Sequence, residues 1–229
     1  MSASFPEPSV CVTYRNALYG FFEGKGVPLF FKKDSVIEFG GKPASYVYLI
    51  KEGVVKQCFL DHSGNSKTLL LLTKGDLFGE ITLLQQNIDL VITEAHSDVE
   101  VERMPADLFL QIAEGEPRIY YYISLMLSSK ARIFMAQVQD SSFEDTMHKL
   151  KNLLWRLSCQ LGTPVPGGIK IVPRFTHEDL ARMISSTRST VTKKMRVLET
   201  ERFLEVSSRH IIIIKNPDAY ASGSSGNPG

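Results

Sequence analysis

The feature that most constrains the fold is a change in hydrophobic periodicity near Pro117. From about Val36 to Ser97, short apolar runs rich in β-branched and aromatic residues alternate with glycine-containing turns. This pattern is typical of antiparallel strands rolled into a barrel or sandwich. After Pro117 the apolar residues recur every three or four positions, which predicts a long helix over residues 117–140. The sequence therefore predicts a β-roll followed by helical structure.

The length of 229 residues suits two domains of ordinary size. No run approaches the roughly 18 apolar residues that a membrane span requires, and the start "MSASFPEPSV" has no secretory signal. We therefore expect a cytoplasmic protein without a membrane partner. Cys11, Cys58 and Cys159 are far apart in the sequence, which predicts isolated reduced thiols rather than disulfides or a metal clip.

The helix predicted over residues 117–140 has one apolar side. Its apolar positions lie at steps of 4, 4, 3 and 4, and they are Ile123, Leu127, Ala131, Phe134 and Val138. Such a stripe must be covered, either by its own domain or by a second copy of the same helix. The residues alone leave both arrangements open.

A second domain is expected to begin at Ser141, because Ser141 and Glu144 have the spacing of an N-terminal capping box. The helix that follows is expected to end at Gly162. Residues 163–168, "TPVPGG", are expected to form a loop, and Ile169 to Val172 a short strand.

Two short helices are predicted in tandem between Phe175 and Glu199. Thr176 opens the first helix and Thr187 opens the second, which is the arrangement of a helix-turn-helix. Buried positions of the second helix are Val191, Met195 and Leu198. The opposite face has no carboxylate and carries Arg188, Ser189, Thr192, Lys193 and Arg196. The following "RFLEVSSRHIIIIK" predicts a β-hairpin wing.

The charge distribution favours DNA as the partner of this face. The whole chain has a net charge of only +1, yet residues 169–215 contain ten Lys or Arg and five Asp or Glu. An Arg at the start of a helix in the major groove can donate two hydrogen bonds to guanine, which makes Arg188 the candidate base reader. Lys193 and Arg196 suit phosphate contacts, and we expect His177 near phosphates as well. The alternative is a solvated helix in an ordinary small α+β domain.

These segments resemble the CRP/FNR family of bacterial transcription regulators from about residue 30 to 215. In the first half, "IEFGGKPASYVYLIKEGVVK", "KGDLFGEITLL" and the segment from Ala95 to Pro105 are similar to the family's β-roll cassettes in order and spacing. In the second half, "FTHEDLARMISSTRSTVTKKMRVLE" resembles its helix-turn-helix, with the Thr-Arg-x-Thr-Val core at 187–191. The resemblance implies an α+β fold with a cyclic-nucleotide-binding-like β-roll, a long central dimerisation helix and a C-terminal winged helix-turn-helix.

On this basis four regions are expected. They are a β-roll effector-sensing domain over 1–116, a dimerisation helix over 117–140, a winged helix-turn-helix over 141–217 and a flexible tail over 218–229.

The resemblance implies a homodimer that binds a two-fold symmetric site on double-stranded DNA, with RNA polymerase as a further partner. The DNA-binding residues that it implies are Arg188, Ser189, Thr187, Thr190, Thr192, Lys193, Arg196 and His177. Ser189 stands where cAMP-type members place a Glu that accepts from cytosine, so this contact should be missing. Ser185 stands where the turn usually has Gly, and a positive φ there would cost about 1 kcal/mol.

The effector is expected to be a small apolar or aromatic molecule rather than cAMP. The family holds cyclic nucleotides with an Arg in the cassette after "FGE", because a buried phosphate needs a fixed counter-charge. Gly75 to Glu102 contains no Lys or Arg, and Lys130 or Arg132 is expected to be available for an anionic end. The expected pocket residues are Phe78, Gly79, Glu80, Leu90, Val91, Lys130 and Phe134. The segment "NIDLVITEA" also resembles halorespiration regulators that sense halogenated aromatics.

Other sensors are weighed against this expectation. An iron–sulfur cluster would need four clustered cysteines and is excluded by the three isolated ones. A haem sensor using His62, His96 or a Met, and thiol redox control through Cys11 and another cysteine, stay open. No catalytic or metal-ligand spacing is present, so we expect a non-enzyme without cofactor or metal. The remaining alternative is a ligand-binding module whose basic domain docks a protein partner.

Overall fold

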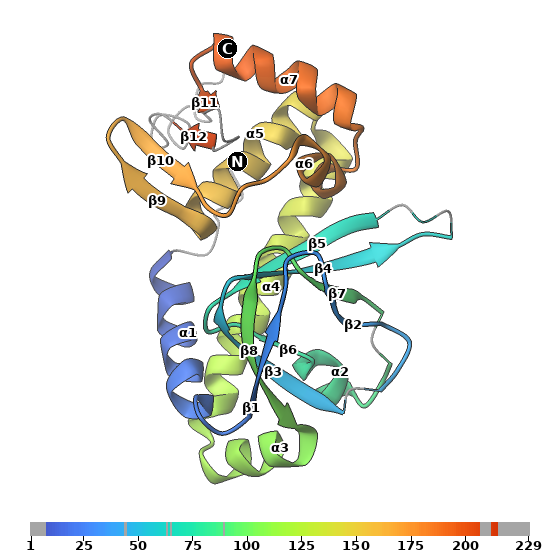
Figure 1. Ribbon diagram of the computed structural model, residues 1–229, viewed down its shortest axis with the longest axis vertical. Helices are drawn as coiled ribbons and strands as arrows, with labels where there is room; N and C mark the ends of the chain where they lie inside the picture. Colours follow the sequence, from blue (N-terminus) through green and yellow to red (C-terminus); the bar gives the residue numbers. More distant parts are fainter. Residues whose placement is uncertain are drawn as a thin grey trace. The chain divides into compact units, whose positions relative to one another are not determined.

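The computed structural model describes residues 8–43, 45–62, 64, 66–88, 90–206 and 212–214. In this described part the chain forms two compact units (Figure 1). The β-roll unit is Ser9–Ile133, and the C-terminal unit contains Phe134–Gly229. The long helix α4 (Arg118–Phe143) contributes to both units. The predicted long helix is therefore confirmed and extends three residues further than expected.

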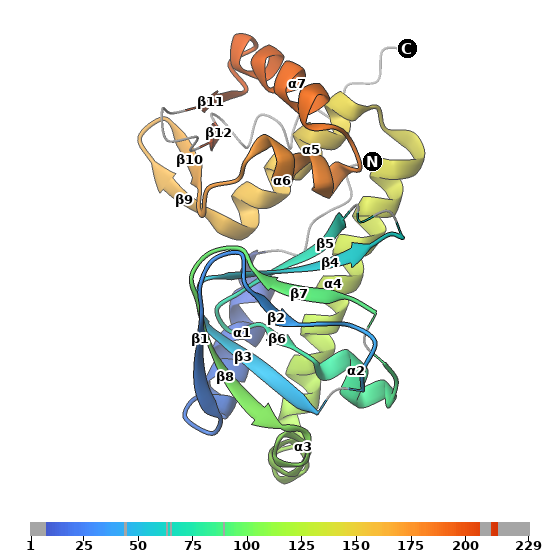
Figure 2. The same ribbon diagram turned by 45° about the vertical axis from the view of Figure 1, so that its right-hand side comes forward.

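The β-roll unit contains two antiparallel four-stranded sheets (Figure 2). The order in the first sheet is β1 (Val27–Phe31), β8 (Val99–Pro105), β3 (Tyr46–Glu52) and β6 (Leu77–Phe78). The order in the second sheet is β2 (Val36–Glu38), β7 (Ile92–Ala95), β4 (Val54–Leu60) and β5 (Ser66–Thr73). The prediction of a roll of antiparallel strands is confirmed.

Strand β3 is buried on both faces, which is why its sequence is almost continuously apolar. Tyr48 and Ile50 belong to a core formed with residues of both sheets, such as Val55 and Leu72 of the second. The alternate residues of β3, beginning with Val47, belong to a second core outside the roll. One strand thus joins the two hydrophobic cores of the unit.

The second core is covered by three helices, α1 (Pro8–Phe22), α3 (Ala106–Gly115) and the first part of α4. Phe22 of α1 stacks on Phe109 of α3 with ring centroids 5.0 Å apart. The sequence analysis did not predict α1. The i, i+4, i+8 spacing of Tyr14, Leu18 and Phe22, all buried, is the signal that could have found it.

A buried ionic cluster fixes α1 to the turn between β5 and β6. The Asp76 side chain accepts hydrogen bonds from Arg15 Nη2 at 2.8 Å, Arg15 Nε at 3.0 Å and the Tyr14 hydroxyl at 3.1 Å. It also accepts from the backbone N–H of Thr73 at 2.9 Å, and Asp76 is only 1% exposed. Burial, together with the charge of Asp76, raises the pKa of Tyr14. These hydrogen bonds of the Asp76 carboxylate are therefore all made within the β-roll unit.

One of the predicted glycine-containing turns connects β4 and β5, whose last paired residues are Leu60 and Ser66. Gly64 has a φ of 82°, a conformation that favours glycine. Ser63 and Asn65 lie outside the described residues.

The C-terminal unit combines three further helices with one small sheet. The helices are α5 (Thr146–Leu161), α6 (His177–Ile184) and α7 (Arg188–Thr200). The sheet is antiparallel, with the order β11 (Leu204–Val206), β12 (Ile212–Ile214), β10 (Gly168–Ile171) and β9 (Gly162–Val165). The predicted wing corresponds to β11 and β12, and residues 207–211 between them lie outside the described part of the chain. The α+β fold class is confirmed.

Two local expectations were wrong. Ser141 does not cap a helix, because α4 continues past it and its hydroxyl donates to the Val138 carbonyl. Asp145 caps α5 instead, and hydrogen bonds from the backbone N–H groups of His148 and Met147 lower the pKa of its carboxyl. Residues 163–165 form part of β9 rather than a loop. Pro164 is compatible with β9 because this strand lies at the edge of its sheet.

The C-terminal end of α5 agrees with the prediction, since the helix ends at Leu161 and Gly162 follows. Gly162 has a φ of −84°, so left-handed geometry is not the reason for glycine. A Cβ atom there would clash with the Ser158 carbonyl. The expected bounds of the four regions remain a prediction. Within the described residues, no helix is both long and apolar enough to cross a membrane.

The Asp76 cluster gives a first prediction. We expect Asp76→Ala to lower the free energy of unfolding by about 2–4 kcal/mol, because Arg15 and the Thr73 N–H would lose a buried acceptor. Arg118→Ala is the control, since it removes an ion pair with Glu116 that is largely exposed and should change stability by less than about 1 kcal/mol. Urea unfolding followed by circular dichroism measures both. Equal effects of the two variants would contradict the role of Asp76.

Candidate nucleic-acid interface and effector region

The first helix of the predicted helix-turn-helix is closed at its N-terminus by a capping box. The Thr176 hydroxyl accepts from the backbone N–H of Asp179 at 3.1 Å, and the Asp179 carboxylate accepts from the backbone N–H of Thr176 at 2.8 Å. Four side chains of α6 are buried, and they are Leu180, Ala181, Met183 and Ile184. This pattern fixes α6 against the interior of the C-terminal unit.

The turn between α6 and α7 depends on Ser185, which has a left-handed conformation with φ 52° and ψ 53°. The backbone N–H of Ser186 donates to the Ala181 carbonyl at 3.0 Å. Thr187 then caps α7 by accepting from the backbone N–H of Thr190 at 3.2 Å. The positive φ considered for Ser185 from the sequence is therefore present, and the hydrogen bonds on both sides keep the turn tight.

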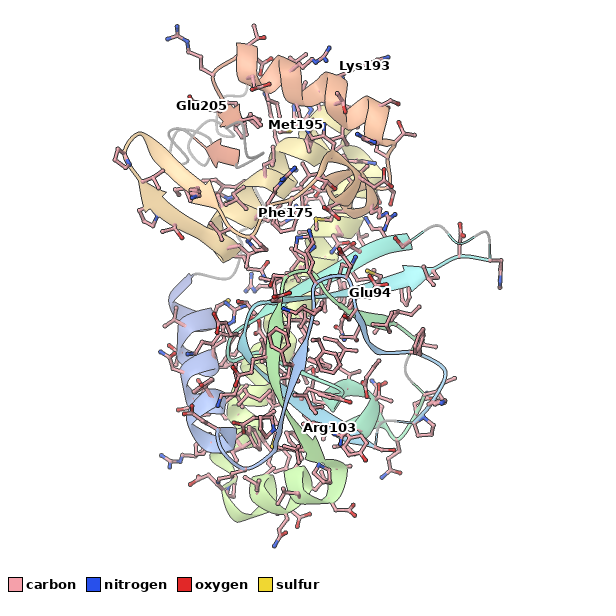
Figure 3. The ribbon with its side chains drawn as sticks, in the orientation of Figure 1. Glu94, Arg103, Phe175, Lys193, Met195 and Glu205 are labelled. Atoms are coloured by element: carbon pink, nitrogen blue, oxygen red, sulfur yellow. The ribbon has the colours of Figure 1, made fainter. Side chains whose placement is uncertain are left out.

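Helix α7 has two faces of opposite character. Val191, Met195 and Leu198 are buried, whereas the other face exposes Arg188, Ser189, Lys193 and Arg196. Figure 3 shows Lys193 and Met195 on opposite sides of the helix. The sequence prediction of these two faces agrees with the structure.

The exposed cations of α7 have no carboxylate partner within the described part of the chain. None of the ion pairs found there includes Arg188, Lys193 or Arg196. By contrast, Arg182 of α6 lies 3.2 Å from Glu178. The face of α7 therefore presents positive charge that no described residue of this unit neutralises.

The remaining predicted residues surround the start of α7. The Thr187 hydroxyl lies 3.0 Å from that of Ser189 and 2.9 Å from that of Thr190. His177, which the sequence analysis placed near phosphates, is half-buried, and its Nδ1 lies 2.9 Å from the Thr192 hydroxyl. The side chain of His177 on α6 thus contacts the face of α7 that contains Thr192.

Helix α5 supports this pair of helices and is itself connected to the end of α4. Asn152 Nδ2 of α5 donates to Asp140 Oδ1 at 2.7 Å. Arg156 Nη1 lies 2.6 Å from Asp140 Oδ2 in an ion pair whose N–H group is not aligned for a hydrogen bond. Sequence reasoning missed these contacts. Asn152 and Arg156 are four residues apart on one face, which is the signal that could have suggested a shared partner.

In the β-roll unit, three of the predicted effector residues, Phe78, Gly79 and Glu80, lie at the turn from β6 into α2 (Glu80–Gln85). Phe78 is fully buried and stacks on Tyr48 with ring centroids 4.5 Å apart. Burial raises the pKa of Tyr48, and the neighbouring Glu38 raises it further. Gly79 has a φ of 89° and lies so close to the Tyr46 carbonyl that a Cβ atom would clash.

Lys130 requires a correction. Its ammonium group lies 2.6 Å from Glu80 Oε1 and donates to the Leu77 carbonyl at 3.0 Å, and both Lys130 and Glu80 are buried. The expectation that Lys130 is available for an anionic effector was therefore wrong, because Glu80 already neutralises it. This ion pair could not be predicted from the sequence, because the two residues are 50 positions apart.

The other predicted effector residues are more dispersed. Leu90 is 73% exposed and Val91 is half-buried. Phe134 lies on α4 in the C-terminal unit and is 37% exposed. Of the alternative sensor residues, His96 and Cys58 are buried, whereas His62 is exposed. The structure thus groups Phe78, Gly79 and Glu80 with Lys130, and leaves the remaining residues as predictions.

Comparison with known proteins matches each unit to a family model. Residues 28–116 match the model described as a cyclic nucleotide-binding domain, and residues 148–220 match that of a Crp-like helix-turn-helix domain. The chain is 28% identical over 193 residues to the global nitrogen regulator of Synechococcus elongatus, covering 83% of this chain and 86% of that protein. It is 25% identical to the cAMP-activated global transcriptional regulator CRP of Pasteurella multocida, covering 79% and 86%.

A solved structure, FixK2 from Bradyrhizobium japonicum, has a TM-score of 0.75 and 19% sequence identity, covering 89% of this chain and 99% of that one. At this identity the likeness shows the fold alone. It agrees with a β-roll, a long helix and a C-terminal helix-turn-helix in one chain.

The conformation of Ser185 gives a second prediction. We expect Ser185→Gly to raise the free energy of unfolding of the protein by about 0.5–1 kcal/mol, because relief of the left-handed strain exceeds the entropy that glycine adds to the unfolded chain. Ser186→Gly is the matched control and should be neutral or destabilising, since Ser186 has no positive φ. Thermal unfolding measures both variants. A destabilised Ser185→Gly variant would show that the Ser185 side chain matters more than its backbone strain.

Proposed function

Because the chain belongs to the CRP/FNR family of transcription regulators, we propose that it is a homodimeric, ligand-responsive regulator that reads a two-fold symmetric DNA site through α7. The observation that carries the proposal is the exposed face of α7, with three cations that have no carboxylate partner among the described residues. A single helix fits the major groove of B-DNA. Positive charge without internal partners is what the phosphate backbone attracts.

The position of each residue along α7 supports a division of roles. Arg188 is the first residue of the helix, where its guanidinium can reach a guanine edge and donate two hydrogen bonds. Lys193 and Arg196 lie further along and suit phosphate oxygens. Ser189 cannot accept from cytosine as a carboxylate would, so the half-site should differ from that of members with Glu at this position.

The exposed apolar side of α4 supports the homodimer. Met135 and Val138 are each 63% exposed, and Phe134 is also exposed. A stripe of this kind on a long helix is unfavourable in water and is covered when two copies pack against each other. Two copies would also present two α7 helices, which matches a two-fold symmetric DNA site.

For the effector, the proposal is a small apolar or aromatic molecule other than cAMP. Residues 75–102 have no Lys or Arg to hold a phosphate, and the Lys130 ammonium is neutralised by Glu80. The relative from Pasteurella multocida is named as activated by cAMP, but we do not expect cAMP to activate this protein. The alternative is a haem sensor that uses His62, His96 or a Met, or thiol redox control through Cys11 and another cysteine; of these residues, His96 is buried.

The proposal includes RNA polymerase as a further partner. It also places the protein in the cytoplasm, where it would bind its DNA site. The competing proposal is a module whose basic unit docks a protein instead of DNA.

Substitutions on α7 test the DNA-binding proposal. Arg188→Ala should weaken binding to the preferred site by about 1–3 kcal/mol and relax the preference at one base pair per half-site. Lys193→Ala should weaken binding to all sequences alike and reduce the magnitude of the salt slope by about 1 for each phosphate that is no longer neutralised. Gel-shift titrations over a salt series, with sites selected from random DNA, measure both. Arg118→Ala, an exposed cation in the other unit, is the control and should bind as the wild type does.

For the unmodified protein, the slope of log K against log salt should have a magnitude of about 5 or more. If the wild type shows no saturable DNA binding at low salt, this result would support the competing proposal, in which the basic unit docks a protein. If Arg188→Ala loses affinity equally for every sequence, Arg188 acts as a phosphate contact and not as the base reader.

The exposed stripe of α4 gives a separate prediction. Val138→Glu should convert the dimer into a monomer, because it places two charges in an apolar seam that is dehydrated on association. Val12→Glu is the matched control, since Val12 is an exposed helical valine on α1. Sedimentation velocity over a concentration series measures the mass of each. A wild-type protein that is already monomeric, or a dimer that survives Val138→Glu, would contradict the proposed seam.

A further inference from the structure

The side chain of Thr192 on α7 has an unusual set of contacts for a residue on the exposed stripe. We propose that Thr192 recognises a thymine in each half-site through its methyl group and not by a hydrogen bond. The inference rests on the proposed DNA-binding function, and it specifies one base that the site should contain.

The hydroxyl of Thr192 is already used inside the protein. It donates its hydrogen to the Arg188 carbonyl, with an oxygen-to-oxygen distance of 2.9 Å. A hydroxyl has only one hydrogen, so toward His177 it acts as the acceptor, and the Nδ1–H of His177 donates to it at 2.9 Å. Donating to a DNA base would require Thr192 to give up the bond to Arg188.

Thr192 nevertheless lies where a base contact is expected. It follows Arg188 by one turn and precedes Arg196 by one turn, so the three residues form one stripe along the helix. Thr192 is half-buried, because His177 and its own helix cover one part of it. Its side chain has only two branches, so the methyl group is what remains to meet a ligand on this stripe.

The two hydrogen bonds also fix the rotamer. A β-branched side chain has few χ1 states, and bonds from the hydroxyl to Arg188 and to His177 select one of them. His177 is therefore a positioning residue, which holds the Thr192 methyl group in place from the neighbouring helix α6. The 2.9 Å contact places the His177 ring against α7.

The major groove offers a matching partner for a methyl group. Thymine presents its C5 methyl and the O4 acceptor there, whereas cytosine presents an amino group and no methyl. A methyl contact needs no donor, so it leaves both hydrogen bonds of Thr192 intact. Burial of one methyl group corresponds to a factor of about 4 in affinity per half-site and about 15 for a symmetric site.

Deoxyuridine provides the test, because it lacks only the C5 methyl of thymine. Symmetric sites are selected from random DNA with the full chain at low salt, and each thymine of the half-site is then replaced by deoxyuridine in both halves. Dissociation constants are measured by fluorescence anisotropy for the wild type, Thr192→Val and Thr192→Ser. Valine keeps a methyl group and loses the hydroxyl, whereas serine keeps the hydroxyl and loses the methyl group.

The wild type and Thr192→Val should lose about 15-fold in affinity at one symmetric thymine position, and Thr192→Ser should show no loss there. His177→Ala should reduce this discrimination, and His177→Asn, which restores an N–H donor, should recover it. Specific binding without any sensitivity to deoxyuridine would overturn the inference alone. Sensitivity that persists in Thr192→Ser would also overturn it. Absence of saturable DNA binding by the wild type would overturn the proposed function together with it.

Discussion

Burial of Val191, Met195 and Leu198 is the constraint on which the rest of the DNA-binding proposal depends. A helix has one rotational setting about its axis, and three buried residues on one stripe determine it. Each fully buried side chain contributes about 1.5–3 kcal/mol, and any rotation of α7 would have to expose these side chains while burying Arg188 or Lys193. The basic face is therefore set by the apolar one, and no separate interaction is needed to point the cations outward.

The same logic explains why the turn before α7 tolerates strain. A left-handed Ser185 costs about 1–2 kcal/mol, but the turn joins two helices whose buried residues contribute several times that amount together. The caps at Thr176 and Thr187 satisfy backbone N–H groups at the starts of both helices. Packing of the two helices thus determines where the turn lies and imposes the left-handed backbone at residue 185. The side chain at position 185 changes the stability of the protein but not its fold.

Periodicity was sufficient to predict the faces of α7, the long helix α4 and the strands of the β-roll, because each depends on spacing within one segment. It could not predict pairs such as Asp76 with Arg15, Glu80 with Lys130 or His177 with Thr192, whose partners lie 61, 50 and 15 residues apart. It placed a helix cap at Ser141, whereas Asp145 caps α5, because Ser and Asp are both common at this position and local spacing does not tell them apart. The missed contacts are those that tertiary packing creates.

The Glu80–Lys130 pair bears directly on the kind of effector that this β-roll unit can accept. A buried ion pair is nearly neutral as a whole, and removing one partner leaves an uncompensated buried charge at a cost of about 3–5 kcal/mol. An anionic ligand at this turn would have to separate Lys130 from Glu80 and leave that carboxylate buried without its counter-charge. A neutral apolar or aromatic ligand requires no such separation. The pair that occupies the Lys130 ammonium therefore supports the proposal of a small apolar or aromatic effector, and it does so independently of the missing Arg in residues 75–102.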